Sequence, residues 1–375
     1  MSTLVVSDLH FGSRARADLL RSPDVREPLI ALLREGVERL VLLGDALELR
    51  QGPMREALAS ARPFFAAAGA ALGADGEIVL VPGNHDHALV APWLERRHRD
   101  EAPPPLGLAE TASVLASDTA AVLAQAAQPA RLTLAYPGVW LRDDVYAMHG
   151  HYLDRHITVP TLERLSAGAM GRIVGALPPS GAVPNDYERA LAPIYAWSTA
   201  LAQHADDEAT GTYGVSLRAW RMLSGNGHRP LRRRALLALF PLTIAAVNRA
   251  GLGPVRADIS GAELGRAGAR AMAQAVERLG LAAAGAAHVL FGHTHRAGPR
   301  TADGAGAWTT ASGVRLHNAG CWVYERQFLS ATPYESPYWP GVAIRVEETG
   351  PPVALRVLDG LGAAELNQAL TRVQA

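Results

Sequence analysis

The chain has 375 residues, of which 49% are hydrophobic and 19% charged, and its formal net charge at pH 7 is zero. This composition excludes a largely disordered chain, and the balanced charge counts against a nucleic-acid binder. The one cysteine, Cys321, excludes an internal disulfide framework and favours a reducing compartment. Because an apolar run begins almost at the first residue, with no basic stretch or cleavage site before it, we expect a cytoplasmic protein.

Short apolar runs that end abruptly in polar residues recur along the chain. In order they are residues 3–10, 39–48, 77–86, 144–150 and 288–295. Each predicts a buried strand, and the first three are separated by segments with helical periodicity, residues 24–38 and 54–72. Alternating strands and helices predict an α/β fold, in which ligand sites lie beyond the carboxyl ends of the strands.

Residues that can bind a metal or move a proton follow each predicted strand. They are Asp8, His10, Asp45, Glu48, Asn84, His85, Asp86, His149, His151, His293 and His295. Singly, such residues have ordinary structural explanations, since an aspartate can cap a helix and an asparagine can occupy a turn. Their recurrence at five strand ends indicates one shared site. Imidazole and carboxylate together favour Mn, Fe, Zn or Ni over Ca or Mg, and the number of ligands predicts two ions.

The order of these motifs resembles the calcineurin-like metallophosphoesterase superfamily. The motifs are D-x-H from Asp8, G-D-x-x-E from Gly44, G-N-H-D from Gly83, H-G from His149 and G-H-x-H from Gly292. The resemblance implies a four-layer α/β/β/α sandwich whose catalytic core comprises residues 1–151 and 288–375. Three short apolar segments near the C-terminus, within residues 314–324, 339–348 and 353–360, are expected to complete the second sheet of that sandwich.

The resemblance also implies a role for each residue of the motifs. The first ion would be held by Asp8, His10, Asp45 and His295, and the second by Asp45, Asn84, His149 and His293. Asp45 would therefore bridge the two ions, and the two histidines of H-x-H would serve different ions. His151 competes with His149, which we prefer because the family ligand is the histidine directly before glycine.

The implied activity is hydrolysis of a phosphoester or pyrophosphate by two divalent transition-metal ions, with manganese the first choice, that share an attacking hydroxide. His85 matches the family histidine that approaches the leaving-group oxygen, and Glu48 matches the carboxylate that orients it. Three arginines, Arg14, Arg16 and Arg50, follow strand ends, where a guanidinium can bind phosphate. Simple solvation is the ordinary interpretation of these arginines.

Residues 152–287 separate the two parts of the predicted core. Helical periodicity in residues 159–177 and 268–285 predicts a mainly helical insertion, and its position makes it a candidate lid. Within it, residues 229–249 set an arginine cluster against an apolar run that is too short for a membrane span. A buried helix, a peripheral membrane contact and a homodimer contact are three interpretations of this segment.

The substrate class stays open between a phosphorylated small molecule and a lipid-linked phosphoester. A similar helical insertion covers the site in the superfamily branch that hydrolyses UDP-2,3-diacylglucosamine, although that branch typically has arginine where this chain has His85. Two alternatives are a metal-dependent nuclease, whose binding would depend on salt, and a non-catalytic interaction platform. Loss of ligands would mark such a platform, and none of the motif residues is missing.

Overall fold

The computed structural model describes residues 2–99, 103–159, 161–204, 242–256, 261–326, 329 and 332–372. Its strands are β1 Thr3–Val6, β2 Arg39–Leu43, β3 Glu77–Val81, β4 Ala109–Ala112, β5 Arg131–Arg142, β6 Val145–Met148, β7 His288–Phe291, β8 Arg315–Asn318, β9 Val342–Val346 and β10 Val353–Arg356. Its longer helices are α1 Pro23–Leu33, α2 Met54–Leu72, α3 Ala91–Arg99, α4 Asp118–Ala126, α5 Leu162–Val174, α6 Pro184–His204, α9 Gly261–Arg278 and α10 Ala363–Arg372. Short 3-10 helices are η1 Leu19–Arg21, η2 His87–Leu89, η3 Val114–Ala116, η4 His151–Arg155, η5 Ala305–Trp308 and η7 Pro333–Glu335.

The strands form one hydrogen-bonded path in the order β10-β9-β1-β2-β3-β5-β6-β7-β8, with β4 paired to β5. Strands β1, β2, β3 and the start of β5 are parallel, and so are β6, β7 and β8. Strand β5 is antiparallel to β6, which makes the sheet mixed. The predicted α/β class is confirmed.

The long strand β5 joins the two halves of the sheet. Residues 131–134 pair with β3, whereas residues 138–142 pair with β6, and Gly138 lies opposite Met148. The chain therefore runs past the carboxyl end of β3 along β5 and returns along β6. This return brings the carboxyl end of β6 back to the edge where the parallel strands of the first half end.

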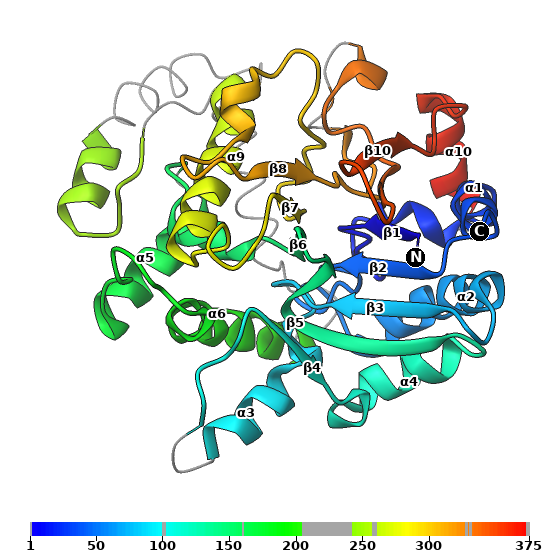
Figure 1. The fold of residues 1–375 in the computed structure, drawn as a ribbon, viewed down its shortest axis with the longest axis horizontal. Helices are drawn as coiled ribbons and strands as arrows, with labels where there is room; N and C mark the ends of the chain where they lie inside the picture. The colour runs from blue at the N-terminus through cyan, green and yellow to red at the C-terminus, as the bar shows by residue number, and fades with distance from the viewer. Residues whose placement is uncertain are drawn as a thin grey trace.

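Side chains that alternate along the strands divide the core into separate clusters. Leu4 and Leu40 belong to a cluster with α1, α2 and α4, and Val289 belongs to another with α5, α6 and α9. Val5 of β1 and Leu290 of β7 share a third cluster. The sheet is therefore curled, so that its two halves contact each other through one set of side chains while helices cover the opposite sets (Figure 1).

The C-terminal strands depart from the sequence prediction. Strand β8 does extend the second half of the sheet beside β7. Strands β9 and β10, however, do not complete that half, because β9 pairs antiparallel with β1 and β10 pairs with β9. A short apolar segment predicts a strand but does not specify its neighbour, and here the neighbour is the first strand of the chain.

The described part of the insertion is helical, as predicted, and comprises η4, α5, α6, a helix over residues 242–249, and α9. The arginine cluster of the 229–249 segment lies outside the described residues, so the three interpretations of that segment stay predictions. Among the helices of the described ranges, none combines the length and apolar character that crossing a membrane requires.

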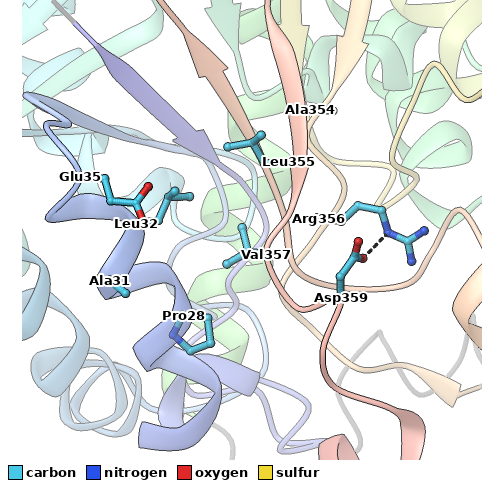
Figure 2. Close-up of a pocket in the computed structure, with 9 residues that line it drawn as sticks. All are labelled: Pro28, Ala31, Leu32, Glu35, Ala354, Leu355, Arg356, Val357 and Asp359. Carbon is cyan, nitrogen blue, oxygen red and sulfur yellow. Dashed lines mark ion pairs between the residues drawn. The ribbon is translucent and has the colours of Figure 1, made fainter.

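A surface groove of about 540 Å³ lies between α1 and β10, at the edge of the first half of the sheet (Figure 2). Its lining includes Leu32 of α1 and Leu355 of β10, together with the ion pair between Arg356 and Asp359. None of the predicted site residues lines this groove.

Candidate metal centre

The predicted ligands lie in the loops at one edge of the curled sheet. Asp8 and Asp45 follow β1 and β2, Asn84 follows β3, His149 directly follows β6, and the H-x-H pair from His293 follows β7. The parallel strands bring their carboxyl ends to a common edge, and the return along β6 adds His149 to it. Five segments that are far apart in the chain therefore supply one centre.

The first group of donor atoms comes from Asp8, His10 and His295. Their ligating atoms all lie within 4.8 Å of one another. His10 Nε2 is 3.2 Å from His295 Nε2, which is 3.3 Å from Asp8 Oδ1. Asp8 is fully buried, and its Oδ1 has no hydrogen-bond partner among the described residues. An ionised oxygen buried in this way needs a positive charge nearby.

The second group comes from Asp45, Asn84, His149 and His293. Asp45 Oδ2 is 3.2 Å from His149 Nε2, and Asn84 Oδ1 is 3.2 Å from the same nitrogen and 3.0 Å from His293 Nδ1. Asp45 Oδ2 also lies 3.8 Å from His10 Nε2 of the first group. Asp45 thus lies between the two groups, as the bridging role requires.

Each ligand histidine has a hydrogen-bond acceptor at its outer nitrogen, which is the ring nitrogen that faces away from the centre. His149 Nδ1 lies 2.9 Å from the carbonyl of Leu43, and His10 Nδ1 lies 3.2 Å from Glu48 Oε2. A carbonyl or carboxylate acceptor places the single N–H of a neutral imidazole on that outer nitrogen. The lone pair of the other nitrogen then faces the centre. This is the tautomer that a metal ligand needs.

A divalent cation fits these donor sets. Donor atoms held about 2.1 Å from one ion at right angles to each other lie about 3 Å apart. The separations of 3.0, 3.2 and 3.3 Å within the two groups match this spacing. Nitrogen and oxygen donors without thiolate suit a transition metal rather than a closed structural zinc site.

The charges of the buried side chains also favour a bound cation. Burial opposes ionisation of Asp45, but the neighbouring His149 outweighs it and holds the pKa of Asp45 well below its usual range. Burial also disfavours a charge on His10, yet the neighbouring carboxylates of Asp8 and Glu48 raise its pKa to about 10. Positive charge is therefore stabilised throughout the centre, and a metal ion supplies such charge.

Backbone strain is concentrated at the same residues. The described non-glycine residues with positive φ are Asp8 (57°), His10 (48°), Arg16 (48°), Asp45 (50°), His293 (65°) and His295 (56°). Five of these six are predicted ligands. A left-handed conformation costs about 1 to 3 kcal/mol for a non-glycine residue. Strain of this kind that recurs around one point is typical of a functional site.

Two glycines allow the loops to approach the ligands closely. A Cβ added at Gly83 would overlap Asp45 Oδ1 and the His149 ring. A Cβ added at Gly292 would overlap Ser7 Oγ and the carboxylate of Asp8. The glycines of G-N-H-D and G-H-x-H are therefore required by space around the ligands.

His85 and Glu48 lie beside the first group. His85 Nδ1 is 2.7 Å from Glu48 Oε2, and the His85 ring is 4.8 Å from that of His10. Glu48 is fully buried; burial alone would raise its pKa, but the charge of His85 and the hydrogen bond to His10 lower it to about 2. Glu48 is therefore an ionised acceptor that orients two imidazoles. The His85 side chain is 18% exposed, which leaves it accessible from outside the centre.

The geometry distinguishes His149 from His151. Gly150, with a φ of 105°, turns the chain between them, and η4 starts at His151. His151 points toward Tyr136, whose hydroxyl is 3.4 Å from its Nε2. Burial, together with the charge of His149, holds the pKa of His151 well below its usual range. His149 therefore faces Asp45 and Asn84, whereas His151 is a neutral buried histidine.

The three arginines have different environments. Arg14 and Arg16 are exposed, but Arg50 is buried and donates from Nε to Ser198 Oγ of α6 at 2.9 Å. Its Nη1 lies 2.8 Å from the outer end of the Asn84 side-chain amide, on the side away from His149 and His293. Arg50 is thus a buried cation beside the second group rather than a solvated surface residue.

Several residues around the centre were not given roles by the sequence motifs. Asp86 Oδ2 accepts from the backbone N–H groups of Ala46 and Leu47, which ties the loop after β3 to the loop after β2. Asp154 and Glu325 lie at the outer nitrogens of His293 and His295. Neither residue belongs to one of the five motifs, although Asp154 follows the glycine of H-G by only four positions. Cys321 is buried, and burial raises the pKa of its thiol to about 12, which does not favour a nucleophile.

No protein-family model matches this chain, and no curated protein matches it either.

Proposed function

We propose that the protein is a phosphoester hydrolase with a dinuclear metal centre, built on the four-layer metallophosphoesterase sandwich. The observation that carries this proposal is the position of Asp45. Its Oδ2 lies 3.2 Å from His149 Nε2 and 3.8 Å from His10 Nε2, between two separate groups of nitrogen and oxygen donors. One ion needs only one of these groups, so two ions that share a carboxylate account for both.

The fold supports the same proposal. The two halves of the curled sheet contact each other through one cluster that includes Val5 and Leu290, and helices cover their other faces. In the proposed sandwich these halves are the two inner layers. Residues 1–151 and 288–375 supply both layers, with residues 152–287 inserted between strands β6 and β7.

The first ion would be held by Asp8, His10, Asp45 and His295, and the second by Asp45, Asn84, His149 and His293. When bound, a pair of divalent ions supplies Lewis acidity for the phosphoryl oxygens and lowers the pKa of a water molecule. Manganese, iron, zinc and nickel suit this nitrogen and oxygen donor set.

His85 is proposed to deliver a proton to the leaving-group oxygen. Its Nδ1–H donates to Glu48 Oε2 at 2.7 Å, so its Nε2 is the atom that holds and transfers the proton. The buried, ionised Glu48 stabilises the protonated ring and fixes its orientation. Arg50 lies beside Asn84 and adds positive charge where a phosphate would approach, which is the role that a guanidinium serves best.

The proposed substrate is a small-molecule or lipid-linked phosphoester or pyrophosphate. The test is to purify the protein, reload it with Mn²⁺, measure bound metal, and assay a panel of substrates. The panel comprises phosphomonoesters, phosphodiesters, nucleotide diphosphate conjugates, lipid pyrophosphates and polynucleotides. We expect about two ions per chain and metal-dependent release of phosphate or phosphomonoester. Asp45→Ala should lose both ions and turnover. The matched control Asp24→Ala changes an exposed carboxylate on α1 and should lose neither.

A loaded protein that hydrolyses no member of the panel, or an Asp45→Ala variant that keeps both ions, would contradict the proposal. Hydrolysis confined to polynucleotides, with binding that weakens steeply as salt rises, would favour the nuclease alternative instead.

A further inference from the structure

Asp154 lies next to the proposed second ion although it belongs to no motif. It is in η4, at the start of the predicted insertion, and is only 4% exposed. Its Oδ1 is 3.0 Å from His293 Nε2. A carboxylate only accepts hydrogen bonds when ionised, so the contact places the N–H of a neutral His293 ring on Nε2.

This contact determines which atom of His293 faces the centre. With the proton on Nε2, the lone pair of Nδ1 points toward Asn84 Oδ1, which is 3.0 Å away. The other tautomer would carry a hydrogen on Nδ1 and could not bind a metal through that atom. His149, the second histidine of this group, is fixed by the backbone carbonyl of Leu43. Asp154 is therefore the side chain that orients His293 within this group.

The remaining oxygen of Asp154 supports this interpretation. Asp154 Oδ2 is buried and has no hydrogen-bond partner in the part of the chain that the structure describes. Leaving such an atom unsatisfied costs about 1 to 3 kcal/mol, and more when the group is charged. A dication held by His293 Nδ1 would strengthen the hydrogen bond to Oδ1, which would compensate in part for the unsatisfied Oδ2.

The first group has a counterpart in Glu325. Its Oε2 is 3.3 Å from His295 Nδ1, and His295 Nε2 faces Asp8 and His10. The two histidines of H-x-H thus have separate carboxylates from separate elements. Asp154 contacts the histidine proposed for the second ion, and Glu325 contacts the histidine proposed for the first.

Helix α6 holds η4, and with it Asp154, in place. Tyr152 of η4 donates to Glu188 Oε1 of α6 at 2.7 Å, and Tyr136 of β5 donates to the same oxygen at 2.6 Å. His87, which follows the G-N-H-D motif, lies 3.1 Å from Glu188 Oε2. This buried network joins the helical insertion to the metal centre, so the first residues of the insertion contribute to the centre itself.

We propose that Asp154 is a positioning residue for the second ion, acting through His293, and that Glu325 does the same for the first ion through His295. The proposal rests on the proposed dinuclear function and assigns one positioning carboxylate to each ion. Removal of a carboxylate behind a ligand histidine typically weakens metal binding by about 10- to 100-fold. Each variant should therefore weaken one ion and leave the other unchanged.

The experiment is to titrate the metal-free protein with Mn²⁺ in a calorimeter and to measure the bound metal afterwards. Neither readout depends on activity. Asp154→Ala should raise the dissociation constant of one ion by about 10- to 100-fold. Asp154→Asn, which keeps the size and a neutral acceptor oxygen, should show a smaller increase. Glu325→Ala should weaken the other ion.

A double-mutant cycle decides whether Asp154 acts through His293. In a His293→Ala background, Asp154→Ala should cause no further loss of Mn²⁺ affinity, whereas Glu325→Ala should still cause its full loss. Equal weakening of both ions by Asp154→Ala, no weakening at all, or full additivity with His293→Ala would overturn the inference. If the metal-free Asp154→Asn variant unfolds near the wild-type temperature, its weaker Mn²⁺ binding comes from lost positioning of His293 and not from lost folding. A wild-type protein that binds fewer than two ions would instead overturn the proposed function, and this inference with it.

Discussion

The carboxylate of Asp86 connects the loops that carry Asp45 and Asn84, and its removal should destabilise the protein strongly. Oδ1 accepts from the backbone N–H groups of Gly83 at 2.7 Å and Asp45 at 3.2 Å. Oδ2 accepts from those of Ala46 at 2.8 Å and Leu47 at 3.3 Å. The side chain is fully buried, so water cannot replace any of these four bonds.

The substitution Asp86→Asn keeps the shape of this side chain but exchanges one acceptor oxygen for an NH₂ group. Whichever oxygen is lost, two buried N–H groups lose their acceptor and face a donor instead. Each unsatisfied group costs about 1 to 3 kcal/mol, so the expected loss of unfolding free energy is about 2 to 6 kcal/mol. The loops would also separate, and the affinity for added Mn²⁺ should fall.

Urea unfolding of the metal-free protein, followed by circular dichroism, measures this loss without a contribution from metal binding. The matched control is Asp24→Asn on α1, where the carboxylate is 68% exposed and pairs with Arg372. That change should alter the unfolding free energy by no more than about 0.5 kcal/mol. An Asp86→Asn variant that unfolds at the same urea concentration as the control would refute the connecting role of Asp86.

Three further predictions concern catalytic turnover, the room around Gly83, and the dependence of stability on pH. His85→Gln should retain bound metal while turnover falls by about 10²- to 10⁴-fold, and unchanged turnover in a loaded variant would remove the proton-transfer role. Gly83→Ala should lower both stability and metal content, because the added Cβ overlaps Asp45 Oδ1; a metal-replete variant would show that the loop has room to shift. His288 Nδ1 lies 2.9 Å from His317 Nε2. Burial and, to a smaller extent, the charge of His288 lower the pKa of His317 to about 4. Since the unfolded chain takes up this proton near pH 6.5, His317 contributes stability above that pH and loses it progressively toward pH 4, by at most about 3 kcal/mol. His317→Gln should therefore flatten the decline in unfolding free energy measured between pH 7 and 4.5, and an unchanged slope would exclude His317 as its source.

Local sequence patterns were enough to predict the α/β class and strands β1, β2, β3, β6 and β7. These strands are buried along almost their whole length, so each is a short run of apolar residues that is visible in the sequence. The long strand β5 was not predicted, because it contains Pro137, which cannot donate to a ladder hydrogen bond and usually interrupts a strand. Helix α9 begins at Gly261, earlier than the periodicity over residues 268–285 indicated. Helix limits depend on capping and tertiary contacts that periodicity does not encode.

The order of residues along the chain was enough to indicate the chemical groups of the predicted ligands, because these residues directly follow recognisable strands. How these groups face one another could be seen only in the folded chain. It placed His149 rather than His151 beside Asp45, and it brought Asp154 and Glu325 to the outer nitrogens of the H-x-H pair. Hydrogen bonds and shared charge act through space, here between residues 285 positions apart, whereas a sequence pattern reports only the local backbone and which of its faces is buried.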